Sequence, residues 1–158
     1  MSTLEVKAIQ APTGYDLQMP AGAIIQVVGG SRVGDLATTS TSFVAQGLTA
    51  TITPKFASSK ILITTLCGFS VPSNDALYFN IERNVGGSGT NLHSHNEGFG
   101  GAQSVTYRGC HTLNYLDSPN TTSAITYKLL VRSGGGNTVE VPAWANALQT
   151  ITLQEVAG

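Results

Sequence analysis

Apolar and polar side chains alternate over residues 124–132, and clusters of turn-forming residues lie on both sides of this segment. One set of alternate positions holds Ile125, Tyr127, Leu129 and Val131, whereas the other set is mixed in polarity. A repeat of two residues is typical of a β-strand with one buried face. The pattern therefore predicts a strand inside a sheet, and its mixed second face suits a surface that another copy of the subunit covers.

The same alternation recurs in short segments along the chain, separated by Gly, Pro, Asn and Ser residues. No segment has the period of 3.6 residues that an amphipathic helix shows. Eight or nine regularly spaced strands predict an all-β fold, an antiparallel β-sandwich with jelly-roll topology. Besides residues 124–132, the predicted strands cover residues 23–28, 48–53, 60–71, 77–82, 104–115, 138–141 and 150–156.

The longest strand signal covers residues 60–71, and apolar side chains occupy both of its faces. We therefore expect this strand to lie in the centre of a sheet. Residues 72–75 (PSND) form a turn signal, because proline presets φ and Asn and Asp tolerate tight backbone geometry. The strands over 60–71 and 77–82 are thus expected to pair in antiparallel fashion across this turn. The glycine pairs at 29–30 and 86–87 are also interpreted as turns, the first of them ending a strand.

Residues 1–20 differ from the rest of the chain, because they contain two short alternating pieces separated by a Pro/Gly break. We interpret them as an extended N-terminal arm, followed by a β-sandwich body over residues 21–158. An extended arm can pair with a sheet edge of another protein, whereas a frayed terminus is the alternative interpretation. The arm residues expected to contact a partner are Leu4, Val6, Ile9, Tyr15 and Leu17.

A polar stretch over residues 85–103 is rich in Gly, Asn, Ser and His, and we expect it to form a long surface loop. Loops of this length are usually functional. His93 and His95 have a spacing that can hold a metal ion, but a zinc site needs three or four ligands and His111 is the only other histidine. We therefore expect no metal site and interpret the two histidines as solvated loop residues.

The composition narrows the possible functions. Charged residues make up 11% of the chain, against about 25% in typical soluble domains. With a net charge of −1 and no run of basic residues, the chain is not expected to bind nucleic acid. Few charges suit a surface used in assembly, because burying an unpaired charge in an interface costs free energy.

No apolar run approaches the roughly 18 residues needed to cross a bilayer, and residues 1–7 contain no apolar core of a signal peptide. We therefore expect no membrane contact and a protein that is made in the cytoplasm. Cys67 and Cys110 both lie in apolar, strand-like segments, where a free cysteine is usually a small buried residue. A disulfide between them is the less favoured alternative, because two cysteines do not make a secreted framework.

The sequence contains no arrangement of residues that is typical of an enzyme. Serines are abundant, but none lies in a Gly-x-Ser-x-Gly motif, and the neighbours of His111 include no acid that could orient it. Asp117, Glu140 and Glu155 occur singly at turns or strand ends and are expected to be solvated. The glycine runs lack the strand-to-helix setting of a phosphate-binding loop. We therefore expect a non-enzymatic protein without a cofactor.

Several segments of the chain resemble one family of proteins. They are residues 1–10 (MSTLEVKAIQ), 20–27 (PAGAIIQV), 58–63 (SSKILI), 116–124 (LDSPNTTSA) and 151–158 (ITLQEVAG). In these segments the chain resembles small virion proteins of tailed bacteriophages, notably phages of cyanobacteria and marine bacteria. The resemblance covers the two ends and the sheet framework. It implies a β-sandwich component of the virion that is not an enzyme and that forms a homotrimer.

The resemblance leaves two functions open, and both place the protein in the virion. The leading hypothesis is a trimeric capsid decoration or cement protein, whose arm and sandwich bind the major capsid protein or other virion proteins and stabilise the head. The alternative is a tail fibre or receptor-binding knob, in which residues 85–103, Tyr107 and Trp144 would contact a glycan or protein of the host surface. A carbohydrate-active enzyme or lectin outside any virus is a third class, which would need a carboxylate pair or a metal site.

Overall fold

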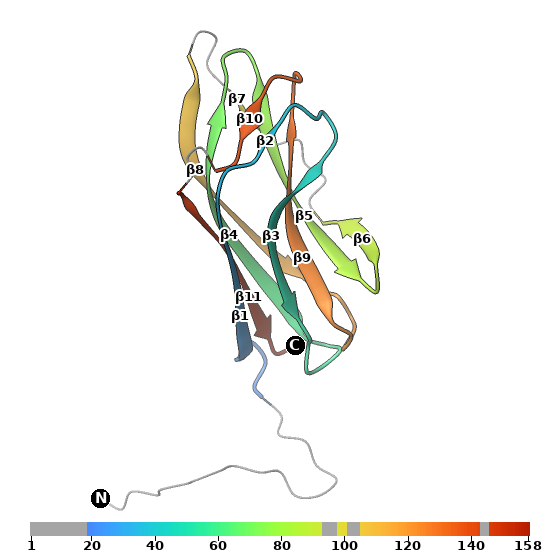
Figure 1. Ribbon diagram of the computed structural model, residues 1–158. Coiled ribbons are helices and arrows are strands. Elements are labelled where there is room, and N and C mark those ends of the chain that lie inside the picture. Colours follow the sequence, from blue (N-terminus) through green and yellow to red (C-terminus); the bar gives the residue numbers. More distant parts are fainter. Residues whose placement is uncertain (1–18, 93–97, 101–104, 143–145) are drawn as a thin grey trace, which may run out of the picture.

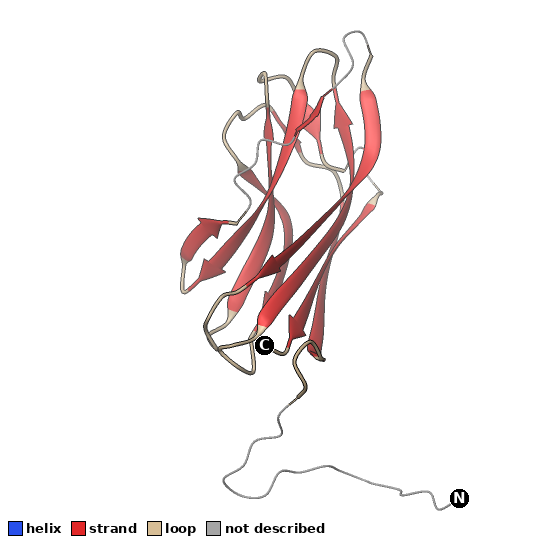
Figure 2. Ribbon diagram, turned by 180° about the vertical axis from the view of Figure 1, so that it is seen from behind, coloured by secondary structure: helices blue, strands red, loops and turns tan. Residues whose placement is uncertain are grey.

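The computed structural model describes residues 19–92, 98–100, 105–142 and 146–158, which form two antiparallel β-sheets packed face to face (Figure 1). The first sheet contains β1 (Ile24–Val33), β2 (Ala37–Thr38), β4 (Lys60–Val71), β8 (Tyr107–Asp117), β10 (Val139–Glu140) and β11 (Leu148–Val156). The second sheet contains β3 (Val44–Ile52), β5 (Ala76–Val85), β6 (Ser88–Asn91), β7 (Gly98–Gly100) and β9 (Ile125–Ser133). Every described segment is strand or loop (Figure 2), and none is a helix long and apolar enough to span a membrane.

Some short strands lie in line with one another, so that each sheet has four strand positions. In the first sheet, β1 pairs with β11, and β2 pairs with β10. Both β11 and β10 pair with one edge of β4, while β8 pairs with its other edge. In the second sheet, β9 lies between β3 and β5, while β6 and β7 share the outer edge of β5. Most connections cross from one sheet to the other. This arrangement is a jelly roll, which confirms the fold class predicted from the strand pattern.

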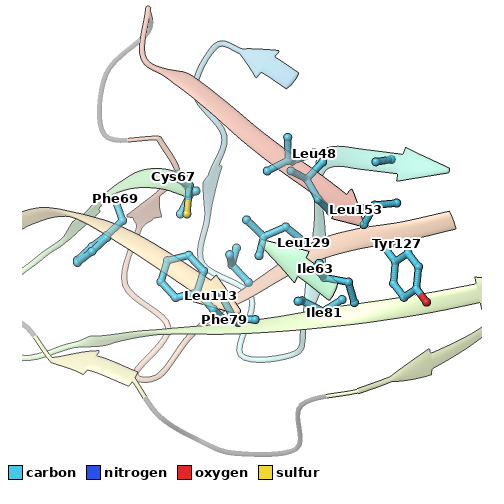
Figure 3. Close-up of a cluster of buried hydrophobic side chains, with 14 of the residues drawn as sticks. Leu48, Ile63, Cys67, Phe69, Phe79, Ile81, Leu113, Tyr127, Leu129 and Leu153 are labelled. Atoms are coloured by element: carbon cyan, nitrogen blue, oxygen red, sulfur yellow. The ribbon is translucent and has the colours of Figure 1, made fainter. Parts of the chain in front are cut away.

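The core lies between the sheets and is built from alternate residues of each strand. The inward face predicted for β9 is confirmed, because all of its side chains are fully buried: Ile125, Tyr127, Leu129 and Val131. Figure 3 shows Leu129 and Ile63 among the buried side chains of this core. As expected, β4 lies centrally, between β11 and β8, and its inward apolar side chains are buried: Ile61, Ile63, Cys67, Phe69 and Val71.

The strands on either side of residues 72–75 lie in different sheets, so the predicted antiparallel pair of β4 with β5 is wrong. Asn74 does adopt turn geometry, with a φ of 59°. The turn carries the chain across the sandwich because Asp75 is held by the end of β9: its carboxylate accepts hydrogen bonds from the Ser133 hydroxyl and the Gly135 main-chain N–H. After the crossing, β5 pairs with β9 instead of β4.

β1 continues through Gly29 and Gly30 to Val33, so the strand end predicted at these glycines is wrong. The glycines serve close packing here. A Cβ atom at Gly30 would collide with the main-chain carbonyl oxygen of Thr49 in β3. Because position 30 has no side chain, β1 can lie against β3 at the side of the sandwich.

Residues 85–103 do not form a single long loop, contrary to the prediction. Gly86 and Gly87 have φ angles of 59° and 93° and form a two-residue turn that leads into β6. Positive φ at both turn residues matches the twist of two paired strands. β6 and β7 both pair with β5. β6 was not predicted because its four residues (SGTN) are polar and exposed and show no apolar alternation. Main-chain hydrogen bonds to β5 hold this strand in the sheet.

The two cysteines lie on opposite faces of the first sheet. β4 pairs with β8 so that Cys67 is opposite His111 and Cys110 is opposite Gly68. Since neighbouring residues of a strand point to opposite faces, Cys67 faces the core and Cys110 faces outward. Cys67 is buried as predicted, whereas Cys110 is exposed, contrary to the prediction. Both thiols are free.

Candidate assembly interface

The outer face of the second sheet is polar, and its charges are engaged within the chain. The Lys128 ammonium lies 2.7 Å from Glu82 Oε1, which joins β9 to β5 by an ion pair. The Arg132 guanidinium lies 3.9 Å from the ring centre of Tyr78, which is a cation–π contact. The side chains of this face thus find partners on neighbouring strands of the same sheet.

The outer face of the first sheet has a different chemistry. Its outward side chains form three rows, each with one residue from β1, β11, β4 and β8 in that order, and we name these rows the apolar face. The rows are Val27–Gln154–Leu62–Leu116, Gly29–Thr152–Thr64–Asn114 and Ser31–Thr150–Leu66–Thr112. No Asp, Glu, Lys or Arg occupies any of these positions. Every polar residue in the rows is neutral, so the rows carry no charge, and the exposed Lys60 and Arg108 lie beyond them on the same side of the sheet.

Large apolar side chains on this face are open to solvent. Val27 is 57% exposed, Leu66 46% and Leu116 51%, and the row beyond Ser31 adds the exposed pair of Val33 and Leu148. These five are half of the large apolar side chains that are exposed among the described residues. Such a concentration on one sheet face is typical of surfaces that bind another molecule.

Two turns of the sandwich are held by buried carboxylates. The Asp75 carboxylate accepts hydrogen bonds from Ser133 Oγ and from the main-chain N–H of Asn137, both at 2.8 Å. The Glu155 carboxylate accepts hydrogen bonds from Gln26 Nε2 and the main-chain N–H of Lys55, at 2.5 and 2.7 Å. Burial alone would raise each pKa, but the hydrogen bonds hold the pKa of both carboxyls below its ordinary value.

A third buried carboxylate, that of Asp117, lies between the two sheets. It accepts a hydrogen bond of 2.7 Å from the Tyr127 hydroxyl and pairs with the Arg83 guanidinium at 2.9 Å. Burial, together with the Asp117 carboxylate, raises the pKa of Tyr127, so the hydroxyl keeps its proton and remains a donor. The expectation that Asp117 and Glu155 are solvated is therefore wrong. These acids stabilise the fold, because their oxygens are taken up by donors from neighbouring elements.

The described residues offer no ready metal site, since no three His, Cys, Asp or Glu side chains gather within them. His111 points inward from β8, and its ring lies on that of Phe79 with 4.5 Å between ring centres. Burial lowers the pKa of His111, which favours the neutral ring. His93 and His95, the pair whose spacing can hold a metal ion, lie outside the described residues.

The residues predicted to contact a partner fall largely outside the described part of the chain. These are the arm residues Leu4, Val6, Ile9, Tyr15 and Leu17, and also Trp144. The structure does place the point from which the arm leaves the body: the main-chain N–H of Gly22 donates to the Ala157 carbonyl, and that of Ala157 donates to the Ala23 carbonyl. Gly22 and Ala23, which follow the predicted arm, therefore lie beside the ends of β1 and β11, in the sheet that carries the apolar face. Tyr107 is described and exposed, and its ring packs against Phe69.

The apolar face itself was not predicted from the sequence. Part of its signal was visible, because Leu62 and Leu66 stand on the second face of the strand over residues 60–71. That pattern predicts a central strand, and β4 is central within its sheet. Whether a further layer covers the second face depends on the whole fold. In the described chain Leu66 remains exposed.

No family model matches the chain, and no curated protein matches it. Among solved structures, the chain is similar to VP2 in the crystal structure of the infectious bursal disease virus VP2 subviral particle, with a TM-score of 0.46 and 12% sequence identity. The likeness covers 97% of this chain, which spans 42% of the length of that VP2 chain. At this TM-score and identity, we draw no functional conclusion from it.

Proposed function

We propose that the chain is a non-enzymatic structural protein of a virion and, within that class, a homotrimeric capsid decoration or cement protein of a tailed bacteriophage. The observation that carries the proposal is the apolar face, an uncharged surface on the outside of a jelly roll. Interfaces are depleted in charged residues at their centres, and this surface has that composition. The class of assembly comes from the resemblance of the strand framework to small virion proteins of tailed phages.

The buried carboxylates support a binding role over a catalytic one. Asp75, Asp117 and Glu155 are all engaged by hydrogen-bond donors that join turns or sheets. A general acid or base needs to reach a substrate with its carboxyl oxygens. Because these three acids hold turns and sheets together, they favour a rigid sandwich that works through its contact surfaces.

The proposed mechanism is added burial of apolar surface, both between copies of the chain in the trimer and at contacts with the head. Each square ångström of apolar surface removed from water stabilises a contact by about 25 cal/mol before the costs of association. An uncharged face keeps those costs low, because no ionised group loses its hydration. The arm would add a second contact through Leu4, Val6 and Ile9. Since Gly22, which follows the predicted arm, lies beside β1 and β11, both contacts would start from the first sheet.

Immunogold electron microscopy on intact virions tests the proposed location. The virions are those of the phage that encodes this chain, and particles from a deletion of its gene serve as the control for antibody specificity. Label spread over the head is the expected result. Label confined to the tail or its tip would favour the receptor-binding knob and direct attention to Tyr107 and residues 85–103. Absence of label from every particle would overturn the virion proposal.

A further inference from the structure

We propose that the apolar face is a contact between copies of this chain, so that its occupant is a second copy. The inference rests on the proposed function in one respect, because it takes the chain to be an assembly protein and names the partner of its apolar face. It concerns the free protein, however, and is measurable without any virion. Figure 1 shows the four strands that form this face, β1, β11, β4 and β8, in a single layer of the sandwich.

The size of the face suits a weak, reversible contact. Four strands at a spacing of about 4.8 Å are roughly 19 Å wide, and at about 3.3 Å per residue the seven residues of β11 from Leu148 to Gln154 extend roughly 23 Å. The face, with the adjoining pair of Val33 and Leu148, thus measures roughly 440 Å² on each copy. Two such surfaces together reach about 900 Å², which is the range of small, transient interfaces.

The absence of charge from the rows favours a second copy over a charged partner. Nucleic acid or an acidic peptide would meet no Lys or Arg in the three rows, and a basic partner would meet no Asp or Glu. A copy of the chain brings a surface that is equally uncharged, so no like charges oppose one another and no lone charge is buried. Leu66 and Leu116 then lose their exposure to water, which is the driving term.

The second sheet is a poor alternative for this contact. Covering its outer face would desolvate the Lys128–Glu82 ion pair, in which both side chains remain partly exposed. Desolvating a surface ion pair costs free energy that the pair itself does not return. The contrast between the two faces within one molecule therefore assigns the contact between copies to the first sheet.

Sedimentation of the full-length chain tests the proposal directly. Wild-type protein is expected to associate reversibly as its concentration rises. Leu116→Glu should raise the midpoint concentration for association by roughly a hundredfold, because it removes an apolar contact and places a charge in the interface. Thr49→Glu is the matched control, since it adds the same charge at an exposed strand position facing outward from the second sheet. Leu66→Glu provides a second test on β4, and circular dichroism checks the fold of each variant.

Cys110 gives an independent measurement on the unmodified protein. Its thiol is exposed in the single chain and lies on the outer side of β8, one residue pair beyond Thr112 along the same face. Its reaction with a thiol reagent is expected to slow several-fold at concentrations where the chain associates. A wild-type chain that stays monomeric, with a Cys110 rate independent of concentration, would overturn the proposal.

The arm is the alternative site of contact between copies, and one further variant separates association through the arm from association through the apolar face. If Leu4→Glu abolished association while Leu116→Glu left it intact, the contact would belong to the arm and the proposal would fail. Immunogold labelling decides the virion location separately. A protein that associates through the apolar face but is absent from particles would keep this inference and refute the proposed function.

Discussion

The Arg83 guanidinium lies 2.9 Å from Asp117 Oδ1 and joins the two sheets of the sandwich by an ion pair. Arg83 belongs to β5 in the second sheet, whereas Asp117 ends β8 in the first. The Tyr127 hydroxyl of β9 donates to the other carboxylate oxygen at 2.7 Å. The three groups form a polar connection between the sheets at one end of the interior.

Asp117→Ala is expected to lower the free energy of unfolding by about 2–4 kcal/mol, because it leaves a guanidinium and a buried hydroxyl without their partner. Glu82→Ala, which removes the surface ion pair with Lys128, should cost less than about 1 kcal/mol. Urea unfolding followed by circular dichroism measures both. Equal losses for the two variants would contradict the structural role assigned to the buried pair.

Gly30→Ala is expected to destabilise the protein by about 1–3 kcal/mol, because the added methyl group collides with the Thr49 carbonyl and forces β1 away from β3. Gly29→Ala is the control on the neighbouring residue. A Cβ atom there lies 3.9 Å from the Ile151 carbonyl oxygen, an ordinary contact. Thermal unfolding of the two variants should therefore differ clearly, and similar midpoints would mean that the strands can separate without cost.

Stability should fall on acidification as Asp75 and Glu155 take up protons. A carboxyl whose pKa is lower in the folded state stabilises the fold above its unfolded pKa, and this contribution is lost as the pH falls through the folded pKa. The loss is therefore expected below about pH 4. Glu155→Gln should reduce the stability at pH 7 and flatten this acid dependence.

One thiol per chain should react with a thiol reagent in the folded, dilute protein, and both should react in urea. The reactive thiol is Cys110, which is exposed. Cys67 is buried and therefore shielded from the reagent. Its burial, and to a smaller extent the nearby Cys110, raises its pKa to about 12. Cys67 thus holds almost no thiolate, the reactive form, at neutral pH. Mass spectrometry of the labelled peptides identifies the residue. Rapid labelling of Cys67 in the folded chain would contradict the assigned register of β4 and β8.

The arm contact proposed for the head is tested by one substitution on each side of the alternating pattern. Leu4→Glu is expected to weaken binding of the full-length chain to heads that lack it by roughly tenfold or more, because an apolar side chain is replaced by a charge. Thr3→Glu, on the opposite side of the pattern, should bind nearly as the wild type does. Co-sedimentation with purified heads measures both affinities. Equal binding would remove the arm from the interface.

Local patterns predicted the inside of this molecule well. The alternation over β9 and β4 identified residues such as Tyr127 and Ile63 as core, because the direction of a side chain in a strand depends only on its neighbours. The same local rules were misleading where a residue has a distant partner. The local pattern predicted a turn at Gly30, whereas the structure places this glycine against β3. It also predicted that Asp117 is solvated, whereas Asp117 pairs with Arg83 of the other sheet.

By itself, the sequence determined the fold class and the buried face of strands such as β9, since both follow from a two-residue period and from turn chemistry. Only the tertiary structure decided which strands pair and which outer face remains open. Val27, Gln154 and Leu116 become neighbours through the register of strands that are far apart in the chain. Because each row of this face combines residues from distant segments, no local sequence pattern predicts it. The lack of charge in the rows becomes evident only once the pairing of the strands is known.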